Sequence, residues 1–199
     1  MLRILIFLMF TCVGHSQILP SQQAVHYKKS APANLDAWDP SEKSAQIDLS
    51  NGNLTATQGS GTNPYWNTVY GTKAVSSGTV EWEITINAWT SHGGNSYDVM
   101  IGISHSRTDE NTHMTNSSHG YAYILENGYK IDDFTGTSYG DSYGVGDVIK
   151  ISLNMTTREL TFYKNGVSQG VAYTVEAGQT YYLAAAFVYS TGTSITITG

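Results

Sequence analysis

A strict alternation of apolar and polar residues marks two segments in the second half of the chain. Residues 79–87 place four apolar side chains on one face, namely Val80, Trp82, Ile84 and Ile86. Residues 148–155 repeat the pattern with Ile149, Ile151, Leu153 and Met155. Because successive side chains of a strand point to opposite faces, this period of two predicts two strands, each with one buried face.

Further strands are predicted beyond these two. Leu160 and Phe162 continue a core face. The pair Asn165-Gly166 predicts a two-residue hairpin turn, since such turns need positive φ at both positions. Residues 171–175, 181–189 and 193–198 are predicted strands as well. No segment shows a helical period, so residues 36–199 are predicted to form one all-β domain, a sandwich or a barrel.

The first residues have the pattern of an export signal. Arg3 precedes an apolar run over residues 4–13, and the small residues Gly14 and Ser16 suit cleavage before Gln17. The run is shorter than the roughly 20 residues that span a bilayer. We therefore expect residues 1–16 to be a signal peptide, residues 17–35 a polar linker, and the mature protein to be secreted without membrane insertion.

Composition narrows the class of protein further. The chain has 199 residues, of which 40% are hydrophobic and 13% charged, and its formal net charge is −6. These values suit one globular domain with a substantial core. There is no basic patch, so nucleic acid is not an expected partner. Cys12, the single cysteine, would leave with the signal, so the mature chain is expected to hold no disulfide.

Three segments together resemble the SPRY domain family. They are SSGTVEWEITI at 76–86, VMIGIS at 99–104, and GVGDVIKISLNMTTRELTFYKNGVSQGVAY at 144–173. The opening WDPSEKSAQIDLSNGNLTAT, at 38–57, looks most like the stand-alone bacterial and phage-type members. The resemblance covers residues 36–199 and implies a bent two-sheet antiparallel β-sandwich of the concanavalin-like superfamily. It implies binding of a protein or peptide through loops at one end of the sheets, and no catalysis.

The carboxylates do not complete a catalytic set. Glu81 and Glu83 share one strand face, about 7 Å apart from two rises of about 3.4 Å each. Sandwich-fold glycanases carry a third carboxylate at the next same-face position, where this chain has Thr85. No nucleophile with a partnered base and no phosphate-binding loop is recognisable. We therefore predict a protein without enzymatic activity, catalytic residues or cofactor.

Histidines gather in one long polar segment between Ile103 and His119. His105, His113 and His119 lie there, but their spacing is wider than that of a closed metal-ligand set. We interpret them as solvated loop residues and predict no metal site.

Aromatic residues in Gly-, Ser- and Asn-rich segments are the candidate ligand-binding residues. Rigid aromatic side chains among small polar residues provide contact area at low entropic cost. The loops expected to carry recognition are 61–66, 89–97, 105–118 and 134–143. The alternative is that these aromatics pack beneath the loops. The candidates are Tyr65, Trp66, Trp89, His92, Tyr97, Tyr139 and Tyr143.

Three sequons, at Asn53, Asn116 and Asn154, would be glycosylation sites in a eukaryotic host. The function expected from the sequence is that of a secreted module that binds a protein or peptide. A glycan-binding module and a structural subunit of an extracellular assembly are the alternatives. The ligand, the oligomeric state and the source organism stay open at this point.

Overall fold

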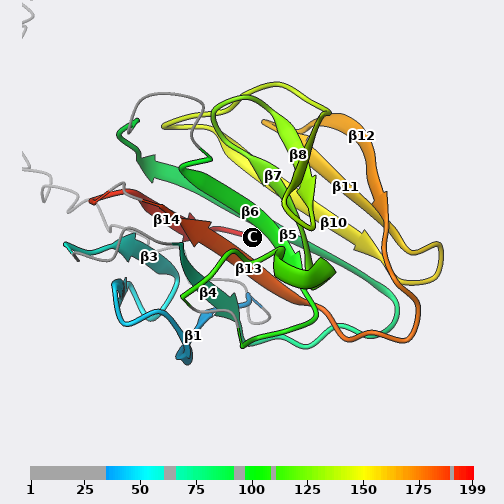
Figure 1. Ribbon diagram of the computed structural model, residues 1–199, viewed down its shortest axis with the longest axis horizontal. Coiled ribbons are helices and arrows are strands. Elements are labelled where there is room, and N and C mark those ends of the chain that lie inside the picture. The colour runs from blue at the N-terminus through cyan, green and yellow to red at the C-terminus, as the bar shows by residue number, and fades with distance from the viewer. Residues whose placement is uncertain (1–34, 61–65, 92–96, 109–110, 189–190) are drawn as a thin grey trace, which may run out of the picture. The chain divides into compact units, whose positions relative to one another are not determined.

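The computed structural model describes residues 35–60, 66–91, 97–108, 111–188 and 191–199, and within these ranges it is all-β apart from one short 3₁₀ turn, Asn116–Ser118 (Figure 1). Its strands form two antiparallel sheets of seven strands each, sheet A and sheet B. The predicted all-β sandwich is confirmed. Residues 1–34, which hold the predicted signal peptide and most of the predicted linker, lie outside the described residues.

The strand order of each sheet follows from the backbone pairing. Sheet A runs β1 (Trp38–Lys43), β4 (Asn67–Gly71), β13 (Tyr182–Phe187), β6 (Val99–Ser104), β7 (Gly120–Ile124), β8 (Tyr129–Asp132) and β9 (Thr135–Ser138). Sheet B runs β12 (Val167–Thr174), β11 (Glu159–Lys164), β10 (Val148–Asn154), β5 (Thr79–Ala88), β14 (Ser194–Ile197), β3 (Thr55–Gln58) and β2 (Ile47–Ser50).

The main core lies between the sheets, and it contains the apolar faces predicted from the alternation of apolar and polar residues. Strands β5 and β10 pair in register, with Ile151 opposite Trp82, and the apolar face of both strands is buried. Trp82 is 1% exposed, and Phe162 and Phe187 are completely buried in the same cluster. Asn165 and Gly166 both have positive φ, 50° and 81°, so the predicted hairpin turn is confirmed as well.

One predicted loop contains a strand. The segment 134–143 lacks apolar alternation, but residues Thr135–Ser138 form β9, which pairs with β8 in a regular register. Sequence reasoning missed β9 because it lies at the edge of sheet A with its small polar side chains mostly exposed. An edge strand of this kind is held by backbone hydrogen bonds and carries little apolar signal.

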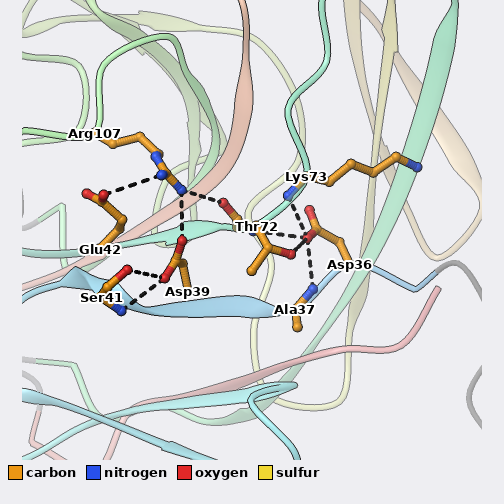
Figure 2. Close-up of polar contacts among 9 residues, drawn as sticks. Asp36, Ala37, Asp39, Ser41, Glu42, Thr72, Lys73 and Arg107 are labelled. Atoms are coloured by element: carbon orange, nitrogen blue, oxygen red, sulfur yellow. Dashed lines mark hydrogen bonds and ion pairs between the residues drawn. The ribbon is translucent and has the colours of Figure 1, made fainter.

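A buried carboxylate ties the start of the domain to the core. Asp36 Oδ1 accepts hydrogen bonds from the backbone N–H groups of Ala37, Thr72 and Lys73 and from the Thr72 hydroxyl (Figure 2). Its Oδ2 accepts from Trp82 Nε1 at 2.9 Å. These bonds satisfy a carboxylate that would otherwise be costly to bury.

Candidate binding surface

Sheet A is apolar on both of its faces. In β4, β6, β7 and β13 nearly every residue is buried, a pattern unlike the clean alternation of β5. One face packs on sheet B, and the other carries a second, separate apolar cluster. Strands buried on both faces need a second covering layer. The members of this outer cluster are Tyr70, Met100, Met114, Ala122, Ile124, Ile131, Ala184 and Ala186.

The cover is the long segment 105–119 that joins β6 to β7. Met114, in the middle of this segment, is completely buried in the outer cluster. Its backbone passes so close to β7 that a Cβ on Gly120 would lie 2.4 Å from the Met114 carbonyl oxygen. The Thr68 hydroxyl of β4 donates to the Thr112 carbonyl at 2.8 Å. Residues 112–114 of the segment are therefore packed onto the sheet by the Met114 side chain and by their backbone.

An arginine fixes the beginning of this segment to β1. Arg107 donates to Asp39 at 3.0 Å, to Glu42 at 3.3 Å and to the Gly71 carbonyl at 3.4 Å (Figure 2). Its guanidinium also lies 4.5 Å from the centre of the Tyr182 ring. The Ser41 hydroxyl, with a further contribution from Arg107, holds the pKa of Asp39 below its usual range. These ion pairs are half-buried, and they join the Arg107 guanidinium to the carboxylates of Asp39 and Glu42.

His113 is buried, which corrects the interpretation of a solvated loop histidine. It is 3% exposed and lies between two aromatic rings, with ring centres 4.6 Å from Trp66 and 4.8 Å from Phe134. The N–H of Thr115 donates to Nδ1, which places the ring proton on Nε2. Burial lowers the pKa of His113 to about 4. The imidazole is therefore neutral at pH 7 and packs beneath Phe134 as part of an apolar layer.

Phe134 lies at the tip of the β8–β9 hairpin and is 56% exposed. The two turn residues, Asp133 and Phe134, have φ of 44° and 62°. A bulky side chain at positive φ is strained, at a cost on the order of 1 kcal/mol or more. Phe134 is the first residue of the predicted recognition loop 134–143 but was not among the candidate site residues. The signal that could have found it is an aromatic residue at a turn position where Asn or Gly is preferred.

Two of the predicted ligand-binding aromatics gather with these residues. Trp66 contacts His113, and both Trp66 and Tyr97 pack against the outer cluster. We refer to Trp66, Tyr97, His113 and Phe134 as the outer aromatic patch. Tyr65 and His92, also predicted ligand-binding residues, lie outside the described residues.

The other three candidates belong to the main core. Trp89 and Tyr139 are half-buried against it, and Tyr143 is 4% exposed with its hydroxyl bonded to the Tyr123 carbonyl at 2.8 Å. Burial raises the pKa of Tyr143. These three rings pack beneath the connections of the sandwich, which was the alternative considered from the sequence.

The predicted loops do not lie at a single end of sheet A. Phe187 of β13 pairs with both Asn67 and Val99, so β4 and β6 begin at the same end. Ser104 pairs with Tyr182 at the opposite end, where the segment 105–119 departs. That segment reaches Trp66 only because it folds back over the outer face of the sheet. The outer aromatic patch therefore lies on the outer face of sheet A, and its residues come from segments that leave the sheet at both of its ends.

The remaining candidates lie elsewhere. Glu81 and Glu83 are exposed on sheet B, and Glu81 pairs with Lys150 at 3.1 Å. Asn53 and Asn116 are half-buried, and Asn154 Oδ1 accepts from the N–H groups of Thr156 and Thr157. Among the described residues, no group of three or more His, Cys, Asp or Glu could hold a metal ion, and none of the helical structure is long and apolar enough to cross a membrane.

Comparison with known proteins accounts for this architecture. Residues 79–199 match the family model of the SPRY domain. The chain is 29% identical over 154 residues to Ran-binding protein 9 of Xenopus laevis, which covers 75% of this chain but only 27% of that relative. The chain thus spans about a quarter of the length of this relative.

Solved structures share the fold at lower identity. The SPRY domain of human HERC1 superimposes with a TM-score of 0.66 at 23% identity, covering 81% of this chain and 96% of that one. The TRIM65 PSpry domain gives 0.60 at 14% identity, covering 82% and 91%, and stonustoxin 0.62 at 15%, covering 82% and 27%. With the family model matching more than half of its length, the chain belongs to the SPRY domain family.

Proposed function

We propose that this chain is an exported protein-binding module whose ligand contacts the outer aromatic patch. SPRY domains are protein–protein interaction modules, and this supports binding of a protein or peptide as the general activity. The export signal expected in residues 1–16 supports action outside the cell. Neither the family nor the export signal identifies the ligand. The choice of the binding surface therefore rests on the geometry of the outer aromatic patch.

The observation that carries the proposal is Phe134. Its ring is exposed and its backbone is strained, so the residue lowers the stability of the free domain in two ways. Strained, exposed aromatics of this kind are typical of residues retained for contact with a partner. The buried His113 ring packs against Phe134 and is itself held by Trp66, so the Phe134 ring is supported from beneath. Preorganisation lowers the entropic cost of binding.

The test begins with capture of the ligand by the full chain from the medium of the cells that secrete it. The affinity of the captured ligand is then measured for Phe134→Ala, Trp66→Ala and the control Val167→Ala, which removes an apolar side chain that is 66% exposed on β12. We expect Phe134→Ala and Trp66→Ala to weaken binding by about 2 kcal/mol, roughly 30-fold, as truncation of an aromatic anchor does. Val167→Ala should leave the affinity unchanged.

A different outcome would place the site elsewhere. If Phe134→Ala and Trp66→Ala bind as the unsubstituted chain does, the outer aromatic patch is not the ligand site. If Glu81→Gln or Glu83→Gln abolishes binding instead, the site is the exposed face of β5, and a glycan becomes the ligand to test on a glycan array. Phe134→Ala removes an exposed side chain, so a retained thermal midpoint shows that a loss of affinity is not a loss of fold.

A further inference from the structure

The two sheets of the sandwich end in four edge strands, β1 and β9 in sheet A and β12 and β2 in sheet B. An edge strand carries a row of backbone N–H and C=O groups that can pair with another chain, and proteins usually blunt such edges with prolines, bulges or charges. The four edges of this domain differ in how far they are blunted.

Three of the edges carry blunting features. Strand β1 contains Pro40 and an irregular register against β4. Strand β2 contains the exposed Asp48 and lies beside β1. Strand β12 has two register shifts against β11, and two of its carbonyls accept hydrogen bonds from side chains of β8 and of the residue that follows β9. Tyr139 donates its hydroxyl to the Gly170 carbonyl, and Lys130 Nζ donates to the Ala172 carbonyl at 2.6 Å.

Strand β9 has none of these features. Its four residues, Thr-Gly-Thr-Ser, include no proline and no charge, and they pair with β8 without a register shift. No other strand of the described ranges pairs with its outer side. In a two-residue hairpin the pair that closes the turn, here Asp132 and Thr135, exchanges both backbone hydrogen bonds. The pairs then alternate, so the N–H and C=O groups of Gly136 and Ser138 point away from β8.

The side-chain surface beside β9 is aromatic. A Cβ on Gly136 would lie only 3.2 Å from the Tyr97 hydroxyl and 3.5 Å from Tyr129 Cδ2, so these two aromatic side chains lie directly against the Gly136 backbone. Tyr129 stands at one end of β9, opposite Ser138, and Phe134 at the other, and both are exposed. A large apolar side chain placed opposite Gly136 by an added strand would pack against these aromatic side chains, as in the pairing of aromatics with edge glycines.

The opposite face of the hairpin is acidic towards the turn; Lys130 shares this face, but its Nζ reaches towards β12 and donates to the Ala172 carbonyl. Asp132 faces away from the outer cluster, because its neighbour Ile131 is buried in that cluster. Its Oδ1 is buried without a hydrogen-bond partner. Asp133 follows at the tip and is exposed. A long basic side chain, one position from the residue that packs against Tyr97 and Tyr129, would lie on this acidic face, since successive side chains alternate between faces.

We propose that β9 is a site of β-strand addition, which takes an extended segment of a partner protein with a large apolar residue next to a Lys or Arg. A second copy of this chain fits less well. Its β9 would offer only Thr, Gly and Ser to pack against Tyr97 and Tyr129, and both chains would carry a net charge of −6. This inference deepens the proposed function, because Phe134 of the patch flanks the same edge.

The probe is a phage-displayed library of random dodecapeptides selected against the full chain. The selected peptides are measured on the unsubstituted chain, on Ser138→Pro and on the matched control Ser138→Ala. Ser138→Pro removes an outward N–H and no bond to β8. We expect Ser138→Pro to weaken binding at least tenfold and Ser138→Ala less than twofold, and the selected peptides to share an apolar residue adjacent to Lys or Arg.

A second measurement does not depend on the fold of a variant. In a paired strand, every second backbone N–H of the peptide points towards β9 and the others point away from it. Methylation of the nitrogens that point towards β9 should abolish binding, and methylation of the others should leave it unchanged. Equal binding to Ser138→Pro, insensitivity to methylation, or no selected peptide at all would overturn the inference. A dimer in light scattering that Ser138→Pro dissociates would assign the edge to a second copy and overturn it as well. None of these outcomes touches the Phe134→Ala test of the proposed function with the natural ligand.

Discussion

At the scale of single residues, the contact between Asp36 and Trp82 shows how the core is specified. The indole supplies the largest side chain at the centre of β5, and its one polar atom donates to a buried carboxylate from the start of the domain. Buried tryptophan N–H groups usually find such a partner. Asp36 also accepts from three backbone N–H groups, so a single side chain joins residues 36–37, 72–73 and the core.

Asp36→Asn tests this arrangement, because an amide replaces one acceptor oxygen by a donor NH₂ group. All the groups around Asp36 donate, so at least one N–H or O–H would face another donor, at a cost of about 1–3 kcal/mol of unfolding free energy. In a Trp82→Phe background the indole donor is gone and the NH₂ group can take its place. Urea unfolding of the two single variants and the double variant should therefore show a coupling of at least about 1 kcal/mol.

Strict additivity of the two substitutions, within about 0.5 kcal/mol, would contradict this account. Val167→Ala serves as the reference for an exposed apolar position and should change the unfolding free energy by less than about 0.5 kcal/mol.

At the scale of elements, the segment 105–119 acts as a cover for sheet A. It contributes Met114 to the outer cluster and His113 to the outer aromatic patch, and Arg107 fixes its first residues to β1. Because His113 is buried in its neutral form, protonation of this one side chain opposes the packed position of the segment.

The stability of the domain should therefore depend on pH through His113. Its pKa is lowered to about 4 in the folded chain, against 6.5 for an exposed histidine. Between these values the unfolded chain binds a proton that the folded chain does not, so stability decreases as the pH falls from 6.5 towards 4. The full effect is about 3 kcal/mol at 1.36 kcal/mol per pH unit. We expect His113→Phe to lose this decrease in stability at low pH. Urea midpoints measured between pH 4 and 6.5 for the unsubstituted chain and for the variant test this.

A half-buried group, Glu126, changes stability with pH in the opposite direction, and the comparison with His113→Phe separates its effect from that of His113. Burial raises the pKa of Glu126 to about 8, and Glu126 accepts a hydrogen bond from the Asp98 N–H at the start of β6. The folded chain therefore holds a proton on Glu126 that the unfolded chain releases, and this contribution to stability is lost as the pH rises from 4.5 to 8. Glu126 is unchanged in His113→Phe, so the same pH slope in both proteins would contradict the role of His113.

At the scale of the whole molecule, the domain joins a large apolar core to a low charge content and a net charge of −6. If residues 1–16 direct export as proposed, the mature domain holds no cysteine, because Cys12 is the single one in the chain. Its stability outside the cell would then rest on packing between the sheets rather than on disulfides.

Export makes a direct prediction about the mature N-terminus. N-terminal sequencing of the protein recovered from the medium should begin near Gln17, after the small residues Gly14 and Ser16. A matched chain with Gly14 and Ser16 both replaced by Leu should be processed poorly, because the cleavage site requires small side chains. Recovery of the protein with Met1 intact inside the cell would contradict export.

The candidate surface could be predicted from the sequence only in part. Trp66 and Tyr97 were candidates because an aromatic residue in a polar segment can be recognised from the sequence alone. Trp89, Tyr139 and Tyr143 have the same local sequence context, but they pack against or within the main core. Whether a ring beside a Gly or Ser is covered depends on which distant segment crosses it. His113 and Phe134, 21 positions apart in the chain, meet only after the segment 105–119 folds back over sheet A.

The alternation in residues 79–87 and 148–155 by itself determined the strands of the main core, because a strand with one buried face has a period of two in its side chains. The turn at Asn165-Gly166 was likewise a local property of two residues that tolerate positive φ. The tertiary structure alone decided the second buried face of sheet A, the neutral state of His113 and the open edge at β9. Each of these depends on a neighbour from a remote part of the chain, since burial and strand pairing are properties of a contact between segments and not of either segment alone.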